Sequence, residues 1–180
     1  MSKEMIINAI LEELDQGMRG LDLAEIDALC DAILEAKRIY VTAAGRSLLL
    51  LKTLAMSLKQ IGLEAYVVGD VTTPGIREGD LLIACSYSGS TKSTRLFTET
   101  AKEKGAKLCL ITAKPSSPIR DTADFTVTIP VYPEKEDSPI FHGYSFNHAT
   151  LTLVYVIMYE ICDRLGATEQ TLLSNHANLE

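Results

Sequence analysis

The first 36 residues carry apolar side chains at helical spacing, with polar residues between them. From Glu4 to Leu14 the apolar positions follow i, i+1, i+4, i+5 and i+8, so they share one helix face: Ile6, Ile7, Ile10, Leu11 and Leu14. We expect Gly17 and Gly20 to end this helix. Asp22 is expected to cap a second helix, in a capping-box-like pair with Glu25, and this helix carries Ile26, Leu29, Cys30 and Ile33.

From Lys37 onward, short apolar runs alternate with helical segments. We expect five of the runs to be strands: Arg38–Thr42, Ala65–Val68, Asp80–Cys85, Lys107–Thr112 and Phe125–Ile129. Helices are expected at Arg46–Ile61 and Thr91–Lys104, and a short helical turn within Pro115–Ala123. Nearly continuous apolar strands joined through helices indicate βαβ units. The chain is therefore predicted to be an α/β protein, a three-layer α/β/α sandwich around a parallel sheet.

The last part of the sequence combines a loop with a long apolar helix. Pro130–Phe141 holds three of the six prolines and an acidic run, which is typical of a surface loop. Ser145–Leu165 is predicted to be a helix that is apolar on almost every side between Ala149 and Cys162. Such a helix is buried in the domain centre or against another subunit, and both can hold. We expect one domain over residues 1–180, with leading helices at 1–36, an α/β core at 37–130 and C-terminal helices and a tail at 144–180.

The composition restricts the partner and the compartment. Lys and Arg number 17 against 24 Asp and Glu, a net charge of −7, and no basic block offsets it, which argues against a nucleic-acid partner. The cysteine spacing fits neither a zinc site nor a redox pair, so we expect buried thiols in a reducing compartment. No signal-peptide pattern is present, and the longest uncharged apolar stretch, Ala149–Tyr159, is too short to cross a bilayer. A cytoplasmic protein with no membrane partner is expected.

Ligands of doubly wound sheets bind beyond the carboxyl ends of the strands, which directs attention to two loops. After the third predicted strand come four hydroxyl residues, an aromatic residue and a glycine: Ser86, Tyr87, Ser88, Gly89, Ser90 and Thr91. A helix start offers unpaired N–H groups and partial positive charge, hydroxyls add donors, and glycine permits close approach. This pattern predicts a cradle for a tetrahedral oxyanion. Ordinary helix capping would explain one or two of the hydroxyls, but not four.

After the first predicted strand, Gly45, Arg46 and Ser47 repeat this arrangement. The Arg46 guanidinium could hold an anionic ligand, although an arginine at a helix start can equally pair with a surface carboxylate. Neither loop contains the glycine pattern of a dinucleotide site or of a Walker A loop. We therefore expect no nucleotide cofactor.

Four stretches together resemble a known family: Gly45-Arg46-Ser47, Val68-Gly69-Asp70-Val71-Thr72-Thr73-Pro74, Ser86–Thr91, and the ending His176-Ala177-Asn178-Leu179-Glu180. They resemble the 6-phospho-3-hexuloisomerase branch of the sugar isomerase (SIS) domain proteins, over nearly the whole chain. The resemblance implies a five-stranded parallel sheet of order 2-1-3-4-5 and a homotetramer with active sites between subunits. It also implies an isomerase that moves a carbonyl between neighbouring carbons of a phosphorylated sugar through a cis-enediol, with no metal and no cofactor.

The sequence departs from the family pattern at several positions. Tyr87 replaces a glycine of the anion loop, Ala43 and Leu48 stand where the first loop usually has glycines, and Phe141-His142-Gly143 replaces a Pro-Met-Gly segment. The family glutamate that follows Phe146, a candidate acid/base, is Asn147 here. Asparagine cannot accept and return a proton.

Enediol chemistry requires a base and a group that stabilises the developing oxyanion. The three histidines are His142, His148 and His176, and an imidazole titrates close to the pH at which a general base works. We expect His148 and His176 to share acid/base duty, with Asn147 orienting the substrate by a hydrogen bond. Asp70 and Glu180 are weaker acid/base candidates. Thr72 and Thr73 are expected to line the site.

Three other functions stay open at this level. The substrate could be another acidic sugar, such as a different sugar phosphate or a 6-sulfo hexose, since Tyr87 and Asn147 alter both ends of the site. The chain could be a non-catalytic sugar-phosphate sensor acting through a partner protein. It could also be a lyase or an epimerase that shares the enediol intermediate. In each case the partner is a small anionic sugar.

Overall fold

The structure is a computed structural model that describes residues 2–131, 140 and 142–179. Seven helices and five strands follow one another in these residues: α1 (Lys3–Arg19), α2 (Leu23–Glu35), β1 (Ile39–Ala43), α3 (Arg46–Gln60), β2 (Ala65–Val67), β3 (Leu81–Cys85), α4 (Lys92–Glu103), β4 (Lys107–Thr112), the 3₁₀ helix η1 (Arg120–Thr122), β5 (Phe125–Thr128), α5 (His142–Leu165) and α6 (Glu169–Ser174). Most of the predicted loop Pro130–Phe141 lies outside the described residues, as does Glu180.

The five strands form one parallel sheet of order β2-β1-β3-β4-β5, as predicted. β1 and β3 are neighbours over their full length, from Ile39 beside Leu81 to Ala43 beside Cys85. The expected alternation of strand and helix has one exception, because no helix lies between β2 and β3 in this fully described part of the chain. The irregular segment 68–80 makes that connection.

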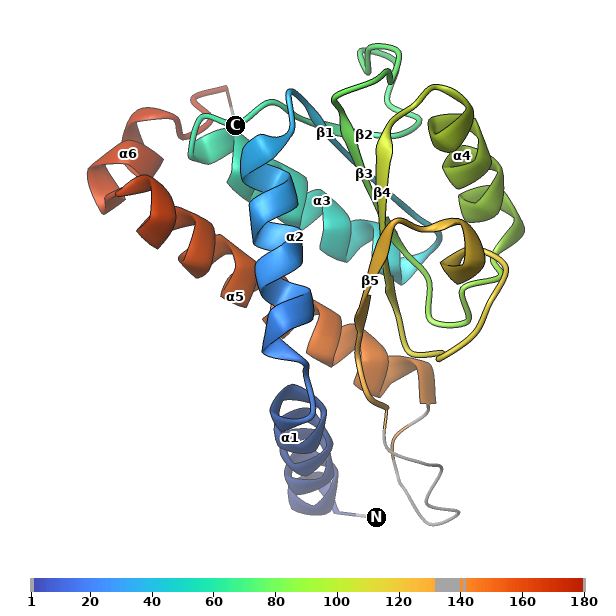
Figure 1. The fold of residues 1–180 in the computed structure, drawn as a ribbon. Helices are drawn as coiled ribbons and strands as arrows, with labels where there is room; N and C mark the ends of the chain where they lie inside the picture. The colour runs from blue at the N-terminus through green and yellow to red at the C-terminus, as the bar shows by residue number, and fades with distance from the viewer. Residues whose placement is uncertain (1, 132–139, 141, 180) are drawn as a thin grey trace.

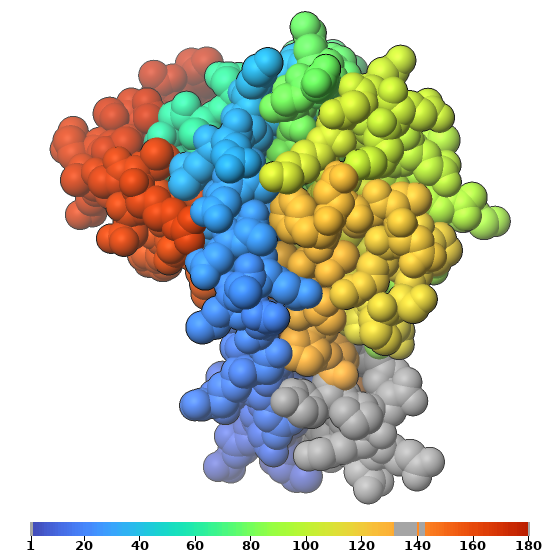
Figure 2. Space-filling view, in the orientation of Figure 1, coloured from blue at the N-terminus to red at the C-terminus, as the bar shows by residue number. Residues whose placement is uncertain are grey.

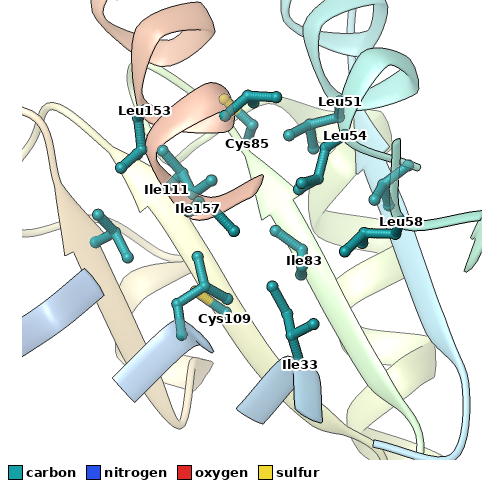
Figure 3. Packing of buried hydrophobic residues seen from close by; sticks show 14 of the residues in the cluster. Ile33, Leu51, Leu54, Leu58, Ile83, Cys85, Cys109, Ile111, Leu153 and Ile157 are labelled. Carbon is teal, nitrogen blue, oxygen red and sulfur yellow. The ribbon is translucent and has the colours of Figure 1, made fainter. Parts of the chain in front are cut away.

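Helices cover the two faces of the sheet unequally. α2, α3 and α5 lie on one face and α4 lies on the other, which gives the predicted α/β/α sandwich (Figure 1). The larger core cluster fills the space between the sheet and the three helices, and Figure 3 labels ten of its members: Ile33, Leu51, Leu54, Leu58, Ile83, Cys85, Cys109, Ile111, Leu153 and Ile157. The smaller cluster lies under α4 and includes Tyr40, Leu82 and Leu108.

The N-terminal helix differs from the expectation in length and in contacts. Gly17 does not end it; the helix runs to Arg19, and Gly17 is buried with Ala149 and the Pro130 carbonyl beside it. α1 packs on α5 and forms the lower end of the molecule in Figures 1 and 2. Much of the apolar face predicted for α1 is exposed, since Ile7 is 55 % and Leu11 is 58 % exposed.

The second helix begins as expected but without the capping-box-like pair. Asp22 caps α2 by accepting a hydrogen bond from the Ala24 amide at 2.9 Å. Glu25 does not reach back to Asp22; its carboxylate accepts the Thr128 amide of β5 at 2.5 Å. The charged residue of the first turn therefore ties α2 to the edge strand of the sheet.

The long C-terminal helix is buried on one side only. Phe146, Leu153 and Ile157 of α5 are buried against α3 and the sheet, whereas Tyr155 and Tyr159 are 50 % and 77 % exposed. The central-core interpretation is thus confirmed for the inner face, and the outer face leaves an apolar surface on the single chain.

Three of the four cysteines behave as the buried apolar residues predicted. Cys30, Cys85 and Cys109 are buried and unpaired, and Cys162 is partly buried. Burial raises the pKa of the Cys30 thiol to about 11 and that of the Cys85 thiol to about 12. These groups therefore stay protonated at neutral pH.

A buried carboxylate holds the irregular segment between β2 and β3. Asp80 has no exposed side-chain surface, and its oxygens accept the Arg38 guanidinium at 2.6 and 3.0 Å and the Arg77 amide at 2.8 Å. Arg38 also donates to the Gly75 carbonyl at 3.2 Å. One ion pair thus connects the start of β1, the start of β3 and the connection between β2 and β3.

Asp80→Asn should lower the free energy of unfolding by about 2–4 kcal/mol, because the buried side chain no longer carries the charge that pairs with the partly buried Arg38. Urea denaturation followed by circular dichroism measures this loss. Asp15→Asn is the matched control, since the Arg19–Asp15 pair is exposed on both sides and should leave the midpoint unchanged. Equal effects of the two substitutions would contradict the assignment.

Two glycines shape the turns after β1 and β3. Gly45 and Gly89 both have left-handed φ angles, of 59° and 60°. A Cβ at Gly45 would meet no atom within 4 Å, whereas a Cβ at Gly89 would lie 2.0 Å from Ser117 Oγ and 2.5 Å from Ser117 Cβ. Gly89 is therefore required both by its backbone angle and by the neighbouring chain.

Gly45→Ala should cost about 1 kcal/mol of stability from the left-handed angle alone. Gly89→Ala should cost more than about 2 kcal/mol, because Ser117 must also move. Both positions have a positive φ and only Gly89 is crowded by Ser117, so comparing their denaturation midpoints tests the effect of this close approach. A smaller loss for Gly89→Ala than for Gly45→Ala would show that Ser117 does not constrain the turn.

Candidate functional site

The two loops singled out in the sequence lie side by side because β1 and β3 are paired in the sheet. Gly45-Arg46-Ser47 follows β1 and starts α3, and Ser86–Thr91 follows β3 and precedes α4. The chain leaves β1 toward one face of the sheet and β3 toward the other, which is the position where ligands bind in doubly wound folds. The start of α5 joins them, because α3 and α5 pack together.

The four hydroxyl groups of the second loop form two pairs. Ser86 Oγ and Thr91 Oγ1 lie 2.9 Å apart, and Ser90 Oγ donates to Ser88 Oγ at 2.9 Å. Ser86 is buried, Ser88 and Thr91 are partly buried, and Ser90 is exposed. The sequence predicted four hydroxyls directed at one point. Instead the first pair braces the loop from inside, and the second pair lies nearer the solvent.

The first turn of α4 keeps its amide groups available. Thr91 is the N-cap residue, and its side chain makes no capping hydrogen bond. Its hydroxyl is the group that contacts Ser86 instead. A helix start without a side-chain cap presents N–H donors and the positive end of the helix dipole to a ligand.

The loop that follows β4 supports the serine loop. The Tyr87 carbonyl accepts the Thr112 hydroxyl at 3.2 Å and the Ala113 amide at 3.3 Å. The Gly89 carbonyl accepts the Ile119 amide at 3.1 Å. The backbone of the cradle is therefore fixed by β4 and η1 as well as by its own residues.

The Tyr87 ring borders the candidate site and contacts both the Phe146 ring and the Lys114 ammonium group. Its ring contacts Phe146 of α5 edge to face at 5.4 Å, and Lys114 Nζ lies 5.2 Å from its centroid. Lys114 was not among the residues predicted from the sequence. The available signal was its place after β4, the next strand of the sheet, whose carboxyl end reaches the same edge.

The first loop contacts the start of α5 at two points. Ser47 Oγ donates to Asn147 Oδ1 at 3.3 Å, so the structure brings these two predicted residues together. The Arg46 guanidinium lies 4.3 Å from the centre of the Tyr144 ring and the residue is exposed. The contact found for Arg46 is thus an aromatic ring, and its charge remains near the solvent.

The two predicted acid/base histidines lie apart from the cradle within one chain. His148 is partly buried, and its place on α5 puts it on the outer face with Tyr155 and Tyr159. His176 follows α6, where Asn175 Nδ2 donates to the carbonyl of Gln60, the last residue of α3. Arg46 is the first residue of that helix, roughly 20 Å away along its axis. His142 is the first residue of α5, and its side chain is outside the described residues.

The threonines after β2 have different surroundings. Thr72 is exposed, whereas Thr73 Oγ1 donates to the Val67 carbonyl at 2.6 Å. Thr73 also lines an apolar cavity of about 120 Å³ between α4 and the segment after β2, with Tyr40 and Phe97. Asp70 pairs with Lys52 at 3.6 Å on the surface. The structure gives Thr73 a role in holding its own segment.

The chemistry available to the site is therefore that of donors and cations. Backbone amides and hydroxyls of the serine loop, together with Arg46 and Lys114, suit an anionic group. In residues 2–131 and 142–179 no group of three histidine, cysteine or acidic side chains is placed to hold a metal ion. In the same part of the chain, each helix is too short or too polar to span a membrane.

Comparisons with known proteins cover almost the entire sequence. The chain is 32 % identical to a 3-hexulose-6-phosphate isomerase of Mycobacterium gastri, over 97 % of this chain and 89 % of that protein. It is 33 % identical to the enzyme of the same name from Methylomonas aminofaciens, over 99 % and 98 % of the two chains.

A solved structure from Methanococcus jannaschii superposes with a TM-score of 0.84 at 30 % identity, over 98 % of both chains. Its crystal structure has been taken to infer a molecular function of 3-hexulose-6-phosphate isomerase. The SIS domain family model matches residues 32–158, which include the whole sheet and most of α5. The chain belongs to the SIS domain family.

Proposed function

We propose that this protein is a cofactor-free isomerase that moves a carbonyl between neighbouring carbons of a sugar with a terminal phosphate. The observation that carries the proposal is the uncapped start of α4, which follows the braced serine loop at the carboxyl end of β3. The named relatives, similar over nearly the whole chain, support a 3-hexulose 6-phosphate as the first substrate to test.

The cradle would hold the phosphate through amide and hydroxyl donors. Ser88, Ser90 and the amides at the start of α4 are the nearest neutral donors, and Lys114 beside Tyr87 supplies a positive charge. Arg46 would approach the sugar from the first loop. Since the net charge of the chain is −7, anion binding depends on these local groups and not on the overall field.

The reaction would proceed by proton transfer alone. A base removes the proton from the carbon next to the carbonyl, the C–H electron pair forms the C=C bond of a cis-enediol, and the former carbonyl oxygen takes up a proton. The former carbonyl carbon then receives a proton, and the hydroxyl on the carbon that first lost its proton becomes the new carbonyl. No oxidant or reductant enters. We assign the base to His148 or His176, because Asn147 cannot transfer a proton.

A complete site would need more than one chain. His176 lies at the far end of α3 from the cradle, and His148 lies on the outer face of α5. That outer face and the neighbouring face of α3 expose apolar side chains, which a homo-oligomer would cover: Leu49, Met56, Tyr155, Val156 and Tyr159. We therefore propose a homo-oligomer, a tetramer as in the sequence resemblance, in which a neighbouring subunit supplies a histidine.

A second function is favoured by one observation. Asn147 occupies the position where the resembling family carries a glutamate, and an amide is inert toward proton transfer. This would suit a module that binds a sugar phosphate without converting it. Binding and turnover must therefore be measured separately.

The protein should exchange the proton next to the carbonyl of 3-hexulose 6-phosphate or fructose 6-phosphate with solvent. Incubation in D₂O followed by NMR measures this exchange and the appearance of the second sugar. His148→Ala or His176→Ala should reduce the exchange at least 100-fold, because the base is lost. Binding without exchange would support the sensor instead. Faster turnover of a 6-sulfo hexose than of the phosphate would redirect the proposal to sulfonated sugars.

Mixing two impaired variants should restore activity if sites form between subunits. Ser88→Ala weakens the cradle and His176→Ala removes the distant histidine, so some mixed oligomers would contain one intact site. The measurement is the isomerase rate after joint refolding, with each variant refolded alone as the control. Rates that remain at the sum of the separate variants, with oligomers present by light scattering, would show that each chain holds its own site.

A further inference from the structure

A polar contact joins the first loop to the start of α5. Ser47 lies in the first turn of α3 and Asn147 in α5, and Ser47 Oγ contacts Asn147 Oδ1 at 3.3 Å. Cys85, the last residue of β3, is 1 % exposed, and Figure 3 shows it at the edge of the apolar cluster, close to α3 and α5. The Ser47–Asn147 contact therefore lies beside the apolar core.

The donors around Asn147 are defined by the contacts of two hydroxyls. Ser47 Oγ donates to the amide oxygen of Asn147. Thr150 Oγ1, on the same helix as Asn147, donates to the Phe146 carbonyl at 2.7 Å and so does not compete for that oxygen.

This assignment fixes which end of the Asn147 amide is available. Its oxygen is turned toward Ser47 and is occupied. Its Nδ2 forms no hydrogen bond with any residue that the structure describes, and it is not a buried atom. The free end of the side chain is thus a donor with two N–H groups.

We propose that Ser47 is a positioning residue that fixes the Asn147 amide so that position 147 donates hydrogen bonds to the substrate. This inference rests on the proposed isomerase function. The acceptor would be the sugar oxygen that gains negative charge as the enediol forms, where N–H donors lower the barrier. A carboxylate at this position could take up a proton, whereas an amide does not titrate and presents its N–H donors when its oxygen faces Ser47. Position 147 thereby stabilises the oxyanion and adds no ionisation of its own to the pH dependence of the reaction.

The orientation can be tested without any activity. The sequence has four asparagines, at positions 8, 147, 175 and 178, so selective ¹⁵N-asparagine labelling gives four side-chain amide signals. Asn147→Asp assigns the signal of interest by its loss. Ser47→Ala should shift that signal and bring its two protons closer to free-asparagine values. Thr100→Ala, which removes an α4 hydroxyl bonded to its own helix, should not.

An Asn147 signal that is unchanged in Ser47→Ala would overturn the positioning role, whatever the enzyme turns over. Ser47→Thr keeps the hydroxyl and should leave the signal near its wild-type position. A folded Ser47→Thr variant with the same shift as Ser47→Ala would show that the hydroxyl does not fix the amide.

Kinetics then link the orientation to turnover. Ser47→Ala should lower kcat about 10-fold and Asn147→Ala about 100-fold, with KM little changed. The double variant should lose no more than Asn147→Ala alone, because Ser47 acts through Asn147. Multiplicative losses would show that Ser47 contacts the substrate itself.

Asn147→Glu distinguishes two roles of position 147. Its kcat should fall if the position donates hydrogen bonds, and should rise if the site lacks a base there. Asn147→Glu should reduce kcat at least 100-fold, since a negative group would face the developing oxyanion. A higher kcat with a new ionisation in its pH profile would mean that the site needs a base at position 147, and would overturn the proposal. If wild type turns over no sugar while the amide signals respond as expected, the isomerase function fails and the orientation stands.

Discussion

The parallel pairing of β1 with β3 is the constraint on which the rest of the site depends. It sets Ala43 beside Cys85, so the loops that begin at Ala44 and Ser86 leave the sheet next to each other at the carboxyl ends of the two strands. Because α3 and α4 then turn to opposite faces, the two loops diverge and leave an edge that neither helix covers. Every feature of the site, from the braced hydroxyls to the Ser47–Asn147 contact, lies along that edge. A shift of one residue in this pairing would separate them all.

The sequence predicted the sheet well because each strand is a nearly continuous apolar run. All of Leu81–Cys85 is buried, and so is Lys107–Thr112 apart from the exposed Lys107; such apolar runs have few alternatives once helices separate them. Predictions based on single residues were weaker. Gly17 was expected to end α1 yet lies inside it, since the tertiary contact with α5 outweighs a modest helix propensity. Glu25 does not form the predicted pair with Asp22, because its carboxylate accepts a hydrogen bond from the Thr128 amide of β5.

The sequence predicted where the candidate loops lie in the fold better than it predicted the contacts of their side chains. Strand order and loop composition located the serine loop, but a sequence has no means to show that Ser86 turns inward to Thr91. Lys114 was missed because a lone lysine carries no motif, and only the folded sheet places it over Tyr87. The pairing of Ser47 with Asn147, separated by 100 residues, depends on how α3 packs against α5. The histidines remain candidates whose partners would come from another chain.

The irregular connection between β2 and β3 has a consequence for small apolar molecules. The segment after β2 and α4 border an apolar pocket of about 120 Å³ that is half-open to solvent and lined by Tyr40, Thr73 and Phe97. Water in such a pocket finds few hydrogen-bond partners, so an apolar group displaces it readily. Small apolar solutes would therefore gather at the threonine-containing segment before they enter the densely packed side that carries α2, α3 and α5.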